Sequence, residues 1–301
     1  MDIAPLSFSL YHSAKHLTGC HVPSQRLFGC FFALVNLRSH TSSMGVLLSH
    51  LYIRQALQMG INQAAIIQGA IIQGAYHGFA APSLGPEPVH PSSVFCDTAL
   101  KNPYPYNPSR GLALLEQHGW HLKSGVLVNA AGQRLAFPLL YQSGSTSVAN
   151  EAQLMKAGWA REGADVTLDP QSITSVSHLI GSPVESPHWA MQVGFQWSCE
   201  PDDCPSGGGL FTPTAGFNPG GCANAHMTRL IRATYAAGTP KQVAARFNAH
   251  QQYAVQQLPV LWVPAPDIMT VVKDGVTGAK SQYNAIVGET PVSRIGLAAG
   301  S

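Results

Sequence analysis

Residues 136–168 read AFPLLYQSGSTSVANEAQLMKAGWAREGADVTL, and this stretch decides the fold class. Apolar residues recur at helical spacing through Val148–Gly163, and Gly163 stands where such a helix would end. The apolar run Leu139–Tyr141 precedes the helix, and Ala164–Leu168 follows it as a second extended run. This order predicts a β–helix–β unit, in which one helix joins two strands of a sheet.

Segments on both sides continue the alternation of strands and helices. Outside the unit, the apolar patterns predict strands at Phe31–Leu37, Trp189–Phe195 and Leu258–Pro264. They predict helices at Leu51–Gln73 (one helix or two short ones), Pro108–Gly119, Ala225–Ala237 and Lys241–Gln257. Turn residues predict a hairpin within Gly125–Tyr141, turning at Asn129–Gly132, and a long loop over Glu200–Asn224. The fold class is therefore α/β or α+β, with a mixed sheet flanked by helices.

The composition excludes several classes of function. Charged residues make up 11% of the 301 residues, against roughly 25% in an average chain, and the formal net charge is +2. The 17 lysines and arginines form no run, so the chain lacks the basic footprint of a nucleic-acid-binding protein. No apolar run is long enough for a membrane-spanning helix, and the first residues do not read as a signal peptide.

The cysteines leave several interpretations open. Six cysteines allow many disulfide pairings, and sequence alone does not choose among them. Cys30–Cys199 would join two strands, whereas Cys199–Cys204 would close a short loop. A metal site made from Cys199, Cys204, Cys222 and His226 lacks the Cys-x-x-Cys pair of most zinc sites, so buried thiols or a disulfide are favoured.

A series of short motifs carries a family resemblance over about Phe31 to Ala299. The motifs are Leu51–Leu57 (LYIRQAL), Ile61–Ile67 (INQAAII), Asn102–Pro108 (NPYPYNP), Gly119-Trp120, Leu139–Tyr141, Phe195–Trp197 (FQW), Pro201–Asp203 (PDD), Leu210-Phe211 and Leu258–Pro264 (LPVLWVP). In order and spacing they resemble the peptide-binding, family 5 group of extracytoplasmic solute-binding proteins that serve ABC importers. The resemblance implies a periplasmic-binding-protein-like fold of type II, in which two lobes close on a ligand.

Family members are much longer than this chain, and most of their first lobe has no counterpart here. The resemblance therefore divides the chain into an unassigned segment 1–30, a second lobe 31–257, and a segment 258–301 that returns to the first lobe. We expect the returning segment to expose an apolar edge or to pack irregularly. We also expect the chain alone to bind peptides weakly or not at all, because one lobe buries only part of a ligand.

The resemblance also implies a ligand site. In peptide-binding members a carboxylate in a second-lobe loop holds the peptide α-ammonium, and Asp202 is the first choice here, followed by Asp203. Trp197 would line the cleft, and Asn218 would hydrogen-bond the peptide backbone. Each has a plainer alternative: a turn cap for the two aspartates, core packing for Trp197 and a turn residue for Asn218. Arg54 is expected at the edge of the core and away from the ligand.

The expected function is that of a binding protein and not of an enzyme. The sequence contains no Gly-x-Ser-x-Gly or His-Glu-x-x-His motif, and no cofactor is implied. By resemblance, the partners are a peptide and the membrane-embedded permease subunits of an ABC importer, and the location is outside the cytoplasm. Two alternatives are a binder of another small solute, such as a nickel complex or haem, and a truncated remnant without function.

Overall fold

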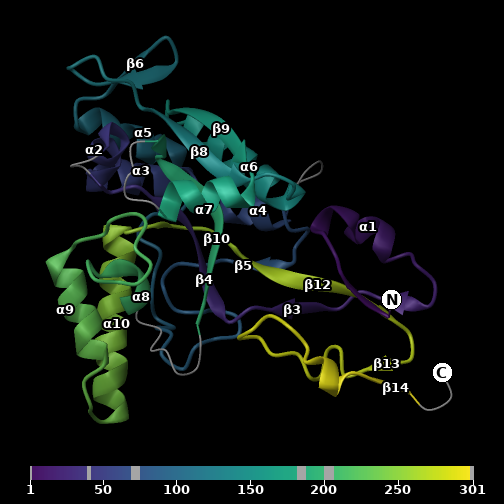
Figure 1. Ribbon diagram of the computed structural model, residues 1–301. Coiled ribbons are helices and arrows are strands. Elements are labelled where there is room, and N and C mark those ends of the chain that lie inside the picture. The colour runs from purple at the N-terminus through teal and green to yellow at the C-terminus, as the bar shows by residue number, and fades with distance from the viewer. Residues whose placement is uncertain (1, 39–41, 69–74, 182–187, 200–206, 299–301) are drawn as a thin grey trace.

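The computed structural model describes residues 2–38, 42–68, 75–181, 188–199 and 207–298 (Figure 1). Within these ranges the chain forms two five-stranded sheets, and one continuous apolar core reaches residues of both. The chain is a mixed α/β structure, as predicted from the alternation of strands and helices.

The first sheet is organised around one long strand, β12 (Ala265–Lys273). Every other strand of this sheet pairs with β12 in antiparallel fashion: β1 (Ile3–Pro5), β2 (Cys20–His21), β3 (Ser24–Arg26) and β5 (Ala80–Ala81). The expectation of an exposed or irregular returning segment is therefore wrong for residues 265–273. Strands of two or three residues are too short to show a hydrophobic period, so no local pattern in residues 3–26 predicts that they supply these partners.

The second sheet contains the predicted β–helix–β unit. Its strands, in spatial order, are β11 (Leu261–Trp262), β4 (Gly29–Val35), β10 (Met191–Ser198), β8 (Ala136–Gln142) and β9 (Asp165–Gln171). β8 and β9 run parallel, and α6 (Thr146–Ala160) joins them, which confirms the prediction from residues 136–168. β10 lies parallel to β8 and antiparallel to β4, and all seven residues of β4 are buried.

Helices pack closely around this sheet because small residues stand where they cross. α6 contacts β8, β9 and β10, and it also packs on α3 (Leu51–Gly60), which in turn packs on α5 (Pro108–Gln117). A side chain at Gly158 of α6 would collide with the carbonyl oxygen of Gly60. Beside this contact, the buried indole of Trp159 donates a 2.7 Å hydrogen bond to Leu57 O. The remaining helices of this region are α2 (Ser43–Ser49), α4 (Gln63–Gln68) and α7 (Ile173–Gly181).

Arg54 lies in the core and ties several chain segments together. Its guanidinium donates hydrogen bonds of 2.7–2.9 Å to the main-chain carbonyls of Leu48, Ser49, Gln257 and Leu258. Desolvation by burial lowers the pKa of this guanidinium to about 10. The side chain is 7% exposed, which agrees with the structural role expected for Arg54.

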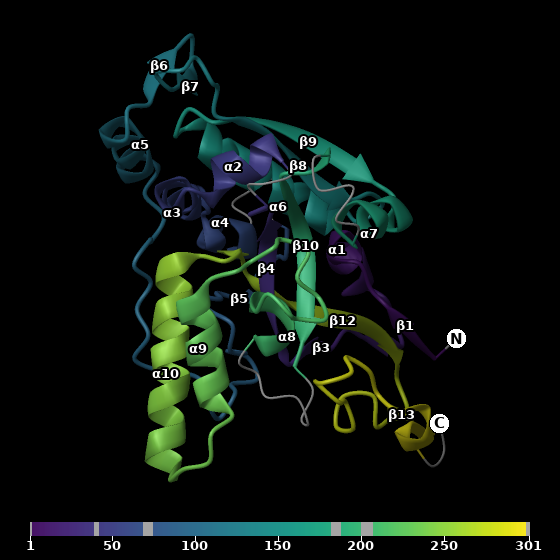
Figure 2. The ribbon, with the colours of Figure 1, turned by 60° about the vertical axis from the view of Figure 1, so that its left-hand side comes forward.

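Two helices lie side by side and extend away from the sheets, α9 (Ala225–Thr234) and α10 (Pro240–Gln257) (Figures 1 and 2). A capping box starts α10: the Thr239 hydroxyl accepts from Gln242 N, and the Gln242 side chain accepts from Thr239 N. Among the described residues, no helix has both the length and the apolar character needed to cross a membrane.

The predicted hairpin differs from the one observed. β6 (His121–Lys123) pairs with β7 (Val126–Val128), and the chain turns at Ser124 and Gly125, both with positive φ. Two successive positive φ angles match the right-handed twist of the strands, so this turn suits a hairpin. The predicted turn at Asn129–Gly132 also reverses the chain: Asn129 N donates to Gln133 O, Leu135 N donates to Leu127 O, and Val128 forms an antiparallel bridge with Arg134. The smaller elements are η1 (Phe8–Leu10), α1 (Tyr11–Ala14), β13 (Val276–Thr277), η3 (Val292–Arg294) and β14 (Gly296–Leu297).

Candidate functional site

The end of β10 carries a row of aromatic side chains. Phe195 stacks on Phe217 with ring centroids 5.1 Å apart and an interplanar angle of 7°. Trp197, two residues further on, lies 5.9 Å from the same ring at 27°. Trp197 is half-buried. Part of its ring therefore packs in the interior, as the core-packing alternative predicted, and the rest forms a surface that a ligand could reach.

A glycine run allows the chain to pass close to this row. α8 (Gly208–Phe211) starts after Gly207, which has a φ of 69°. A Cβ atom at Gly209 would lie 3.2 Å from the Trp197 ring, and one at Gly208 would collide with the Tyr235 hydroxyl. The glycines therefore permit close approach, and the approaching groups are side chains of this chain.

Asn218 holds the next loop in shape. Its amide group donates to Thr212 O (3.0 Å) and Cys222 O (2.8 Å), and its side-chain oxygen accepts from Cys222 N (2.9 Å). Both amide hydrogens are engaged, whereas the oxygen can accept one more donor. This geometry agrees with a turn residue and leaves one acceptor position for a ligand.

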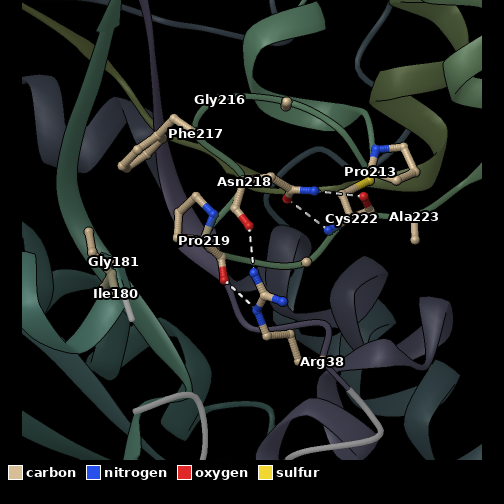
Figure 3. Close-up of a pocket in the computed structure, with 12 residues that line it drawn as sticks. Arg38, Ile180, Gly181, Pro213, Gly216, Phe217, Asn218, Pro219, Cys222 and Ala223 are labelled. Atoms are coloured by element: carbon tan, nitrogen blue, oxygen red, sulfur yellow. Dashed lines mark hydrogen bonds between the residues drawn. The ribbon is translucent and has the colours of Figure 1, made fainter. Parts of the chain in front are cut away.

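A cavity of about 370 Å³ lies beside this loop (Figure 3). Its described lining comes from the loop, from the end of α7 and from Arg38, which follows β4. The Arg38 guanidinium donates to Asn218 O (2.9 Å) and Pro219 O (3.1 Å), so it fixes the loop against the second sheet (Figure 3). Sequence reasoning missed Arg38, Ile180 and Gly181, because nothing in a local pattern brings these distant segments to the loop.

The chemistry of this lining suits binding. Proline, glycine and alanine make up most of the lining, so its polar groups are mainly peptide groups. Among the described lining residues, Cys222 carries a thiol whose pKa is raised by burial, and no histidine or carboxylate stands beside it as a base. The site therefore lacks, in this part of the chain, the nucleophile–base pair that covalent catalysis requires.

The predicted ligand residues have different outcomes. Asp202 and Asp203 lie in 200–206, outside the described residues, so their role stays a prediction. Trp197 and Asn218 lie on either side of Phe217: Trp197 stacks on its ring, and Asn218 follows it in the loop that lines the cavity.

The described residues include all the cysteines except Cys204, and they test the metal site considered from the sequence. Within these ranges, no group of three or more metal-binding side chains is assembled, and Cys204 lies outside them. The Cys30 and Cys199 thiols are in hydrogen-bond contact, and this contact together with burial raises the pKa of Cys30. Both thiols are free in the structure. Cys30 and Cys199 are one of the two cysteine pairs that the sequence offered for a disulfide.

A comparison with protein-family sequence profiles identifies the family of the chain. Residues 19–215 match the sequence profile described as bacterial extracellular solute-binding proteins, family 5 middle region. A comparison with curated protein sequences found no match.

Solved structures of oligopeptide-binding and related proteins share the fold. The oligopeptide-binding protein AppA of Bacillus subtilis, solved with a nonapeptide, superposes with a TM-score of 0.82 at 16% identity, covering 99% of this chain and 56% of AppA. The oligopeptide-binding protein of Thermus thermophilus, solved with a pentapeptide, gives 0.83 at 17% identity, with 99% and 53% covered. NikA of Brucella suis, solved with Fe(III)-EDTA, gives 0.76 at 15% identity, with 99% and 57% covered.

These superpositions establish the fold, which is that of the type II periplasmic binding proteins. The chain spans just over half the length of each of these three proteins.

Proposed function

Because the chain belongs to the bacterial extracellular solute-binding proteins of family 5, we propose that it captures peptides outside the cytoplasm and delivers them to the permease of an ABC importer. In this proposal, residues 31–257 form one wall of a ligand cleft, and residues 258–301 return to the opposite lobe. Capture involves no chemical step and needs only a ligand that favours the closed state.

The observation that carries the proposal is the position of Trp197. It stands at the end of β10, three residues before the segment 200–206 that holds the two candidate carboxylates. Asp202 would accept the peptide α-ammonium in a charge-assisted hydrogen bond, with Asp203 as the second carboxylate. Trp197 would offer its ring to a peptide side chain, and the oxygen of Asn218 would accept a peptide N–H.

The proposal can be tested by NMR on the isolated chain. The chain contains five tryptophans, so ¹⁵N-indole signals can be followed one by one during titration with a pool of di- to pentapeptides. We expect shifts confined to Trp197 and to the Asn218 amide, with weak affinity, because a single wall buries only part of a peptide. Asp202→Asn should weaken the response about tenfold, as expected for loss of a charge-assisted bond.

A matched control is available on the other sheet. Asp274 is exposed and pairs with His21, so Asp274→Asn removes the same charge away from the site. The carboxylate roles would be contradicted if peptides caused equal shifts in Asp202→Asn and in the control Asp274→Asn, and if the shifts in Asp203→Asn were the same as in the wild type. An absence of shifts at Trp197 would contradict peptide capture at this site. The nickel–histidine complex serves as a comparison ligand, and its binding in place of peptides would overturn the peptide proposal.

A further inference from the structure

A second cavity lies where the two sheets meet. It has a volume of about 120 Å³ and is enclosed by α6, by β10 and by the segment that leads from β11 into β12. Aromatic rings make up much of its wall, with Phe8 set edge-on against Tyr76 at a centroid distance of 5.2 Å and Phe31 on β4. Pro264 and Pro266 complete the apolar part of the wall.

Glu151 of α6 provides a carboxylate in this apolar setting. The residue is 1% exposed and lines the cavity. Its Oε2 accepts a 2.8 Å hydrogen bond from the Tyr76 hydroxyl, while its Oε1 is buried and has no partner among the residues that the structure describes. A buried carboxylate oxygen without a partner is costly, so the arrangement calls for a donor that enters the cavity.

A cation is the hydrogen-bond donor that best suits the aromatic wall and the Glu151 carboxylate. An ammonium group brings three N–H donors for the open carboxylate oxygen and interacts favourably with the faces of aromatic rings. Within the described ranges, no basic side chain of the chain itself forms an ion pair with Glu151. Water alone would fill the space, but the aromatic and proline walls offer it few hydrogen-bond partners.

The cavity lies next to the candidate ligand site, across one stacked pair of aromatic rings. Phe195 lines the Glu151 cavity, and it also stacks on Phe217, which lines the larger cavity beside Asn218. A solute lying along β10 could therefore meet both. Gln196, which is exposed, stands between Phe195 and Trp197 at the rim.

We propose that the Glu151 cavity binds a primary alkylammonium group, such as the end of a lysine side chain, carried by the captured solute. This inference rests on the proposed function and narrows its ligand to peptides that carry a second primary amine besides the α-ammonium, such as lysine-containing peptides. Burial raises the pKa of Glu151 to about 7, opposed by the Tyr76 hydrogen bond, so the carboxyl can ionise near neutral pH when a cation arrives.

The test uses n-butylammonium chloride as the probe and 1-butanol as its neutral counterpart. Calorimetric titrations at pH 8 would compare the wild type with Glu151→Gln and with Glu162→Gln, which changes a second buried carboxylate. We expect butylammonium to bind the wild type and Glu162→Gln alike, to bind Glu151→Gln about tenfold or more weakly, and to bind better than butanol.

A measurement on the wild type keeps the proposal testable if Glu151→Gln does not fold. Intermolecular NOEs should connect the butyl methylenes to the rings of Phe8 and Tyr76. Equal affinities for wild type and Glu151→Gln, equal affinities for the amine and the alcohol, or no NOEs to these rings would each overturn the proposal. Butylammonium is not a peptide, so butylammonium binding in the absence of any peptide response at Trp197 would refute the proposed function and leave this site intact.

Discussion

Glu162 is a buried carboxylate that should weaken the fold at neutral pH. It follows α6, is fully buried, and lies against Gly60 and Gly111, where an added Cβ atom would meet its carboxylate. Among the described residues neither of its oxygens has a hydrogen-bond partner. Desolvation therefore raises the pKa of Glu162 from 4.5 to about 9.

The magnitude follows from linkage between protonation and folding. Between pH 4.5 and about 9 the folded state holds a proton that the unfolded state has lost, so raising the pH favours unfolding. Each pH unit in this window costs about 1.4 kcal/mol, which gives about 3 kcal/mol at pH 7 and about 1 kcal/mol at pH 5. Below pH 4.5 this cost is absent, and above about 9 it stays constant.

Glu162→Met tests this reasoning, because methionine has a similar length, is flexible and does not titrate. We expect the stability of the variant relative to the wild type to be about 2 kcal/mol higher at pH 7 than at pH 5, because the pH-dependent cost of Glu162 is absent from the variant. Urea unfolding followed by circular dichroism at several pH values would measure both differences.

Two comparisons make the result specific. Burial also raises the pKa of Glu87 to about 8 and that of Glu151 to about 7, but both groups are present in wild type and variant, so their contributions cancel in the difference. Glu116 is exposed on α5, and Glu116→Met should show no pH-dependent change. A stability difference between Glu162→Met and the wild type that is the same at pH 5 and at pH 7 would refute the reasoning.

Three further outcomes are expected. Gly158→Ala should lower stability by about 1–3 kcal/mol, since its Cβ meets the Gly60 carbonyl; an unchanged Tm would contradict the helix contact. Arg54→Met should cost about 3 kcal/mol or more in urea unfolding by leaving four carbonyls without their donor, and an unchanged midpoint would count against it. Treatment with diamide should join Cys30 to Cys199, with loss of two thiols by mass spectrometry after unfolding and a higher Tm; thiols that both remain alkylatable would exclude the pairing.

The parts of the fold that were predictable are those with a local period. The fifteen residues of α6 carry a helical pattern, and the parallel strands on either side follow from it. The turn at Asn129–Gly132 was predictable because it is a strong turn signal, and the chain does reverse there, whereas the neighbouring hairpin that turns at Ser124 and Gly125 was missed. Both sites turn the chain, and only the tertiary partners decide which turn joins paired strands.

The candidate site was predictable only in part. Trp197 and Asn218 could be named from the motifs around them, but their hydrogen bonds and stacking depend on residues elsewhere in the chain. Arg38 reaches the loop from the end of β4 and carries no motif of its own. Glu151 stands in an ordinary helical pattern, and its burial against Tyr76 follows from a contact between residues 75 positions apart.

The arrangement of the first sheet has a consequence for how the chain folds. β12 pairs Val272 with Ile3, which lies 269 positions earlier (272 − 3), so β1 meets its partner only after β12 has been synthesised. At about 5–20 residues per second, β1 spends roughly tens of seconds on the ribosome with its edge unpaired. Contacts this distant in sequence close late and slow the search for the native state. The N-terminal strands therefore stay unpaired longer during synthesis than strands whose partners lie close in the sequence.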